Sequence, residues 1–243
     1  KIIMPLAALL LTIASEAQKH ENLPRPAMAE EWHDTLPVPD CGVLLPDTLA
    51  PCLQGGPERD SVLTLLFAGD IMGHDGQIAS AYDDSTGTWS YESVFSFVAP
   101  LISDADIAIG NLEVTLGGAP YKGYPRFSSP DALAVACRNA GFDILVTANN
   151  HAADRGPKGI FRTIRVLDSL GIRHTGTWNS SEERDTLSPL MMNRDSITLA
   201  LLSYTYGTNG IVVPPPATVA YIDTVRAATD IAAADGKDAD ATV

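Results

Sequence analysis

Short apolar runs alternate with longer amphipathic stretches along the chain from position 61 onward. The runs carry apolar residues at consecutive positions, which is typical of strands buried on both faces of a parallel sheet. The amphipathic stretches begin near a Pro or end at a Gly, as helices do. Strands that alternate with helices predict an α/β layered fold whose sheet is covered on both sides. We expect strands at 62–68, 106–110, 142–147, 172–175 and 196–204, and helices at 92–102, 130–140, 157–170 and 224–234.

The first 60 residues follow a different pattern. Residues 1–17 combine one basic residue, a short apolar run and small residues at the end, which is typical of a signal peptide; a buried strand or helix is the alternative. The apolar run is too short to span a bilayer. Residues 18–60 are rich in Pro, which predicts a linker or N-terminal extension. We therefore expect one α/β domain at 61–243, in a protein exported to the periplasm or the cell surface.

The last residues, DADATV, follow a predicted helix and have the pattern of a strand that begins there. Since a domain rarely ends where a strand begins, we expect the natural sequence to continue beyond Val243. The absence of an initiator Met indicates that the start is incomplete as well.

The chain is strongly acidic, with a formal net charge of −14 over 243 residues. Such a surface repels phosphate backbones and anionic lipid headgroups, so we expect no nucleic-acid partner. Anionic small ligands are still compatible, because a metal ion or a basic side chain can reverse the field in one cleft. Of the three cysteines, Cys41 and Cys52 can form a disulfide or both be free. Cys137 falls on the apolar face of a predicted helix, which favours core packing.

Three predicted strands lead into polar side chains at intervals of about one βαβ unit. These side chains are Asp70 and His74 after the first strand, Asn111 and Glu113 after the second, and Asn149, Asn150 and His151 after the third. Each residue taken alone is typical of a helix cap or a turn. In a parallel sheet, however, ligands bind beyond the carboxyl ends of the strands. Carboxylate, amide and imidazole groups together suit a divalent ion such as Mn²⁺, Zn²⁺ or Mg²⁺.

The motifs GDIMGH, GNLE and ANNHAADRGPKGI resemble, in this order, three N-terminal motifs of the bacterial capsule-synthesis CapA family, the poly-γ-glutamate accessory proteins. The resemblance covers roughly residues 62–235. It implies a layered α/β/β/α sandwich of the type found in calcineurin-like metallophosphoesterases, whose site holds two metal ions. By this resemblance, Asp70, Glu113 and Asn150 would hold metal, and His74, which follows the first strand, is a further candidate metal ligand. Asp70 and His151 would be catalytic, His151 by donating a proton or binding an oxyanion.

The sequence also departs from the metallophosphoesterase motifs. Met72, Asn111 and Ala152 stand where those enzymes usually carry His, Asp and an acidic residue. Their His-rich C-terminal motifs would lie beyond Val243. The resemblance therefore leaves three functions open. The chain would hydrolyse or transfer a phosphoester or amide bond of an anionic capsule polymer, would bind that polymer or a membrane-bound synthase complex without catalysis, or would act as a periplasmic phosphatase.

The segment YKGYPRFSSP, residues 121–130, alternates basic and aromatic side chains in an otherwise acidic chain. Arg clamps carboxylates and aromatic rings line grooves, so this segment suits an anionic polymer or a small anionic substrate. A solvated loop with packed aromatic rings is the alternative. The candidate substrate-binding residues are Asn111, Lys122, Arg126, Asn149 and Arg155.

Two further segments are expected at the same edge of the sheet. Asp154 and Arg155 can form a local ion pair that orients the imidazole of His151. The segment TYGTNG follows the last long apolar run, so it should also end near the site.

Overall fold

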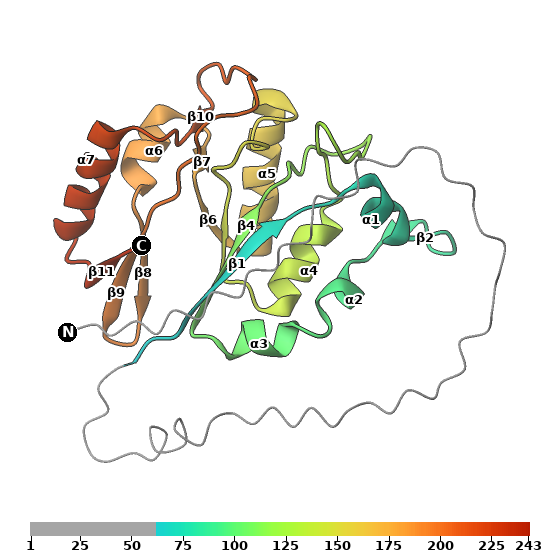
Figure 1. The fold of residues 1–243 in the computed structure, drawn as a ribbon, viewed down its shortest axis with the longest axis horizontal. Helices are drawn as coiled ribbons and strands as arrows, with labels where there is room; N and C mark the ends of the chain where they lie inside the picture. The colour runs from blue at the N-terminus through green and yellow to red at the C-terminus, as the bar shows by residue number, and fades with distance from the viewer. Residues whose placement is uncertain (1–61) are drawn as a thin grey trace, which may run out of the picture. The chain divides into compact units, whose positions relative to one another are not determined.

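The computed structural model describes residues 62–243, which are coloured in Figure 1. The predicted signal peptide, the Pro-rich linker and the pair Cys41 and Cys52 lie outside the described residues. Within 62–243, no helix is both long enough and apolar enough to cross a membrane. Cys137 is a free, buried thiol of the core.

A four-stranded parallel sheet organises the domain (Figure 1). Its strands, in spatial order, are β1 (Leu65–Ile71), β4 (Ile107–Leu112), β5 (Ile144–Val146) and β6 (Arg173–Thr175). All neighbouring pairs are parallel. Strand β4 is buried at nearly every position, because its consecutive apolar residues meet an apolar layer on each face. The prediction of a parallel sheet is confirmed.

Helices cover one face of this sheet. Helices α4 (Ala132–Ala140) and α5 (Gly156–Leu170) connect successive strands and pack on the buried side chains of β4 and β5. Each helix ends at a glycine with positive φ, Gly141 at 106° and Gly171 at 69°. Glycine adopts this conformation without strain, so it is favoured where a helix ends in the left-handed region. Both helices lie within two residues of their predicted bounds.

A second sheet covers the other face. It contains β8 (Leu190–Arg194), β9 (Ile197–Leu201) and β11 (Ala241–Thr242), in the order β11-β9-β8. Apolar side chains of β8 and β9 pack on the isoleucines of β4 and β5. The expectation that the run at 196–204 joins the parallel sheet is wrong: β9 pairs antiparallel with β8, because only two residues connect them. The strand expected in DADATV is confirmed as β11, which pairs with β9.

The first strand lies farther along the chain than its apolar run predicts. We expected it at 62–68, ending before Gly69, but β1 continues through Asp70 to Ile71. The pairing with β4 shifts between Phe67 and Asp70, after which Asp70 lies opposite Asn111. Backbone hydrogen bonds to β4 therefore extend the strand beyond the apolar residues, and Asp70 lies inside β1 rather than in a turn.

The single helix expected at 92–102 is wrong. The chain forms α2 (Glu92–Phe95) and α3 (Ala99–Asp104), with a break before Pro100. Pro100 lacks the backbone N–H that a continuous helix would need at this position, but it is tolerated in the first turn of a new helix, which is its place in α3. The remaining elements are α1 (Asp75–Ser80), β2 (Tyr82–Asp83), β3 (Thr88–Trp89), β7 (Thr177–Trp178), α6 (Ser181–Leu187), β10 (Thr218–Val219) and α7 (Thr224–Asp235).

Candidate functional site

An amide bridge joins two carboxylates at the carboxyl ends of β1 and β4. The Nδ2 group of Asn111 donates to Oδ1 of Asp70 at 2.8 Å and to Oε2 of Glu113 at 3.0 Å. Asn149, which follows β5, donates to Oδ1 of Asn111 at 3.1 Å and to the carbonyl of Leu112 at 2.9 Å. Side chains from three successive strands therefore meet, as their spacing in the sequence predicts. Asn111 and Asn149 use their amide groups to hold one another and the carboxylates.

The two carboxylates strongly influence one another. Burial, followed by the contact with the carboxyl group of Asp70 and by the negative charge of Asp70, raises the pKa of Glu113 to about 7. The nearby His151 and the hydrogen bond from Asn111 act in the opposite direction. A pair of this kind binds either a proton or a cation, since two adjacent negative charges repel one another.

His151 and Asp154 form a buried hydrogen-bonded pair. The Nδ1 atom of His151 lies 2.8 Å from Oδ2 of Asp154, and the same oxygen accepts the backbone N–H of Phe127 at 2.7 Å. Asp154 is 4% exposed. Because an ionised carboxylate only accepts hydrogen bonds, Nδ1 carries the proton and Nε2 is the nitrogen free to accept one.

The ion pair expected between Asp154 and Arg155 is wrong. Arg155 donates from Nη2 to the carbonyl of Pro120 at 2.7 Å, and its side chain packs against Gly117 and Gly159. It therefore secures the loop that precedes the site, whereas Asp154 alone pairs with His151. Asp154 and Arg155 are adjacent in the sequence, but their side chains leave the turn in different directions and therefore bind different partners.

Phe127 contacts two imidazole rings. Its ring centroid lies 4.7 Å from that of His151 and 5.0 Å from that of His74, both edge to face. His74 is the N-cap residue of α1, where its backbone N–H donates to Oε1 of Gln77. The structure thus places His74 in an aromatic cluster around the fully buried Phe127.

The donor set at the carboxylates fits some divalent ions better than others. Within 62–243, no three His, Cys, Asp or Glu side chains gather closely enough to hold a metal ion. Zn²⁺ sites usually need three or four such ligands. Mg²⁺ is commonly held by one or two carboxylates with water in the remaining positions, and Mn²⁺ prefers the same oxygen donors. Asp70 and Glu113 therefore suit Mg²⁺ or Mn²⁺.

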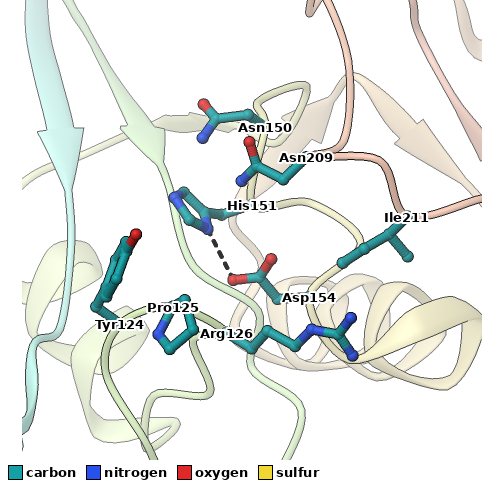
Figure 2. A pocket seen from close by; sticks show the side chains of 8 residues that line it. All are labelled: Tyr124, Pro125, Arg126, Asn150, His151, Asp154, Asn209 and Ile211. Atoms are coloured by element: carbon teal, nitrogen blue, oxygen red, sulfur yellow. Dashed lines mark hydrogen bonds and ion pairs between the residues drawn. The ribbon is translucent and has the colours of Figure 1, made fainter.

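A pocket of about 480 Å³ opens beside the imidazole of His151 (Figure 2). Three separate segments line it: the loop before Phe127, the turn after β5, and a distant loop between β9 and β10. The lining residues are Tyr124, Pro125, Arg126, Asn150, His151, Asp154, Asn209 and Ile211. Of the sequence-predicted residues, Arg126, Asn150 and His151 line the pocket, whereas Lys122 is exposed outside it.

The loop that carries Arg126 is held on both sides. Lys122 and Ser128 exchange backbone hydrogen bonds across it, and the N–H of Gly123 donates to Asp75 at 2.6 Å. Farther along the chain, Arg162 makes a bidentate ion pair with Asp131. These contacts fix the loop at its base. The guanidinium of Arg126 itself has no hydrogen-bond partner among the described residues.

Sequence reasoning did not single out Asn209. It lies in the segment TYGTNG, which we expected at this edge of the sheet, and Asn-Gly is a strong signal for a tight turn. The two residues have φ values of 50° and 74°, and the N–H of Ile211 bonds to the carbonyl of Thr208 across the turn. The Asn-Gly pair predicts the turn, but only the tertiary structure brings it to the pocket.

The model of the family described as bacterial capsule synthesis protein PGA_cap matches residues 64–243. The capsule biosynthesis protein CapA of Bacillus anthracis is 28% identical over 59% of this chain and 34% of its own length. The PGA biosynthesis protein CapA of Bacillus subtilis is 26% identical over 60% of this chain and 38% of its own length. The uncharacterized protein y4sH of Sinorhizobium fredii is 32% identical over 43% of this chain and 24% of its own length. The chain thus spans less than two fifths of these relatives.

Proposed function

The chain belongs to the bacterial capsule synthesis protein PGA_cap family, and on this premise we propose that it acts in making or processing an anionic cell-surface polymer. The names of two relatives, capsule biosynthesis protein CapA and PGA biosynthesis protein CapA, support this proposal. The polymer we infer is of the poly-γ-glutamate type. We further propose that this work takes place outside the cytoplasm, which the signal-peptide-like composition of residues 1–17 supports, and that a membrane-bound synthase complex is the partner.

The reaction we propose is the hydrolysis or transfer of an amide or phosphoester bond. The observation that carries it is the buried pair of His151 and Asp154, whose imidazole lines a pocket large enough for a small substrate. Asp154 holds the Nδ1 proton, so Nε2 of His151 can take a proton from an attacking water and return it to the leaving group. This arrangement of imidazole and carboxylate typically contributes a factor of about 10²–10⁴ in rate.

The carboxylates complete the proposed site. Asp70 and Glu113 would hold one Mg²⁺ or Mn²⁺ ion through their carboxylate oxygens, whereas Asn150, a further ligand expected from the sequence, lines the pocket beside His151. Such an ion polarises a carbonyl or phosphoryl oxygen and lowers the pKa of a bound water. Asn111 keeps both carboxylates oriented, because one amide group donates to each of them. Asn149 in turn fixes the amide of Asn111. The chain's own contribution is thus a preorganised set of oxygen atoms.

A non-catalytic role is the second candidate. Within the part of the chain that the structure describes, only two carboxylates meet at the proposed metal position, and no third His, Cys, Asp or Glu joins them. Met72 and Ala152 also replace residues that metallophosphoesterases usually carry. In this alternative, the same pocket binds polymer, or presents it to a synthase, without breaking a bond.

The test measures turnover by the full-length protein in the presence of Mg²⁺ or Mn²⁺. Short γ-linked glutamate oligomers and phosphoester substrates are incubated with the protein, and products are identified by mass spectrometry. We expect cleavage or transfer that His151→Ala abolishes. His174→Ala is the matched control, because His174 makes a second His–Asp pair, with Asp168, outside the pocket. Product formation that His151→Ala leaves unchanged would refute catalysis at this site, and binding without any turnover would favour the non-catalytic role.

A further inference from the structure

Besides the hydroxyl of Tyr124, three polar side chains of the pocket have no hydrogen-bond partner within 62–243. They are the guanidinium of Arg126 and the amides of Asn150 and Asn209, which come from three segments far apart in the sequence. Figure 2 shows Asn150 and Asn209 on one side of the imidazole of His151 and Arg126 on another. Neighbouring polar groups differ, because Asn111, Asn149 and Asp154 all use their side chains in hydrogen bonds inside the protein.

This difference separates groups that build the site from groups that are free to bind a ligand. A polar side chain next to a cavity either binds water or serves a ligand, and preorganised donors around a cavity are the usual basis of specificity. Arg126 supplies a fork of N–H donors, and each amide supplies two N–H donors and one carbonyl acceptor. Together they offer many more donors than acceptors, so their complement is a group rich in acceptor oxygens.

The turn that presents Asn209 is firmly held. Thr208 donates from Oγ1 to the carbonyl of Ile211 at 2.6 Å, and its hydroxyl lies 3.0 Å from that of Tyr221. The N–H of Ile211 returns to the carbonyl of Thr208 at 2.9 Å. Asn209 itself has a φ of 50°, a conformation that Asn, Asp and Gly tolerate better than other residues. The backbone that carries the amide of Asn209 is therefore held at the pocket before any ligand binds.

The charge of the pocket restricts the ligand further. Arg126 is the one Lys or Arg among the described lining residues, and the carboxylate of Asp154 is buried and hydrogen-bonded to His151 and to the N–H of Phe127. One guanidinium balances the single charge of a carboxylate and matches its planar shape through two parallel N–H bonds. A phosphate monoester carries more charge than one guanidinium balances.

We propose that Arg126, Asn150 and Asn209 form a recognition subsite for a carboxylate group that the substrate carries next to the bond held at His151. This inference rests on the proposed function, since it assigns the substrate orientation in the same pocket. Asn209 is a specificity-determining residue in it, because its amide lies on the other side of the imidazole of His151 from the loop of Arg126 (Figure 2). The carboxylate belongs either to one residue of a polymer or to a free acid of the same chemistry.

The experiment is calorimetric binding to the full-length protein with four probes. These are a γ-linked glutamate oligomer, the same oligomer with every free carboxyl group converted to an amide, N-acetylglutamate and inorganic phosphate. We expect the acidic oligomer to bind and the amide form to bind at least tenfold more weakly, because a hydrogen bond to a charged group typically changes affinity by about that factor. Binding of N-acetylglutamate as tight as that of the oligomer would identify a free acid as the ligand.

Matched variants test the individual residues. Arg126→Gln should weaken binding of the acidic oligomer about tenfold or more. Asn209→Gly keeps the positive φ while it removes the amide, and Asn209→Asp keeps both the turn and the shape while it adds a charge that repels a carboxylate. We expect both to weaken binding, Asn209→Asp more strongly. Arg165→Gln and Asn193→Ala remove exposed side chains that do not line the pocket and should leave the affinity for the oligomer unchanged.

Each remaining outcome separates this inference from the proposed reaction. Equal binding of the acidic and amide oligomers, tighter binding of phosphate, or unchanged affinity in both Asn209 variants would overturn the subsite. Binding that the Arg126 and Asn209 variants weaken, without turnover by the wild type, would support the subsite and refute the reaction. Turnover that His151→Ala abolishes, with a KM that these variants leave unchanged, would support the reaction and refute the subsite.

Discussion

Replacement of Glu113 by Gln tests whether the two carboxylates are as close in solution as in the structure. At low pH the protonated carboxyl group of Glu113 can donate to Asp70 while it accepts from Asn111. A Gln side chain can make the same two contacts with its amide at any pH. The variant therefore mimics the protonated state, and the wild type should differ from it only when Glu113 ionises.

The magnitude follows from the raised pKa of Glu113. The difference between the ordinary value of 4.5 and about 7 would be equivalent to roughly 3 kcal/mol for a fully buried group. Since Glu113 is half-buried, we halve this figure for solvent screening, to about 1.5 kcal/mol. A carboxyl group whose pKa is raised by folding does not destabilise the folded state at a pH below its unfolded pKa. Above that pH its destabilising effect grows, until the pH exceeds the folded pKa. Wild-type stability should thus fall by about 1.5 kcal/mol between pH ~4.5 and ~7.

The assay is urea unfolding of both proteins in the presence of a chelator, at several pH values between about 5 and 8. We expect Glu113→Gln to match the wild type near pH 5 and to exceed its free energy of unfolding by about 1.5 kcal/mol near pH 8. Asp70→Asn should reduce the same pH dependence without abolishing it, because it removes the neighbouring charge while Glu113 stays half-buried. Glu92→Gln is the control, since Glu92 is exposed on α2 and its carboxylate accepts a hydrogen bond from Asn139. A constant difference between wild type and Glu113→Gln at every pH would refute the reasoning.

Three further variants test other parts of the site and the fold by urea unfolding. Asp154→Ala leaves the N–H of Phe127 and Nδ1 of His151 without their buried acceptor, so we expect a loss of about 2–4 kcal/mol; a loss below about 1 kcal/mol would contradict the buried pair. Phe127→Leu removes two edge-to-face contacts with imidazoles and should cost about 1–2 kcal/mol, and unchanged histidine ring signals in its NMR spectrum would argue against those contacts. Asp230→Ala leaves Arg184 buried without its main partner and should cost about 3–5 kcal/mol, whereas a neutral effect would show that water replaces the pair.

Local sequence signals account for much of the fold. The consecutive apolar residues of β4 and β5 predict strands buried on both faces, and the glycines at 141 and 171 mark the ends of α4 and α5. These signals act over a few residues, so they do not depend on what packs nearby. These signals fail where pairing with a strand far away in the sequence determines the bounds or the sheet of an element. Pairing with β4 extends β1 through Asp70, and the hairpin with β8 takes β9 into a second sheet.

The candidate site divides in the same way. The sequence by itself determined that Asp70, Glu113 and His151 meet at one edge of the sheet, because the carboxyl ends of parallel strands converge wherever βαβ units repeat. Only the tertiary structure decided that Asp154, and not Arg155, contributes the partner of His151, and that Asn209 faces the same pocket. The spacing of the strands along the chain determines at which edge of the sheet each loop begins. The direction of each side chain, and the identity of the loops that pack beside it, depend on contacts between segments that are far apart in the sequence.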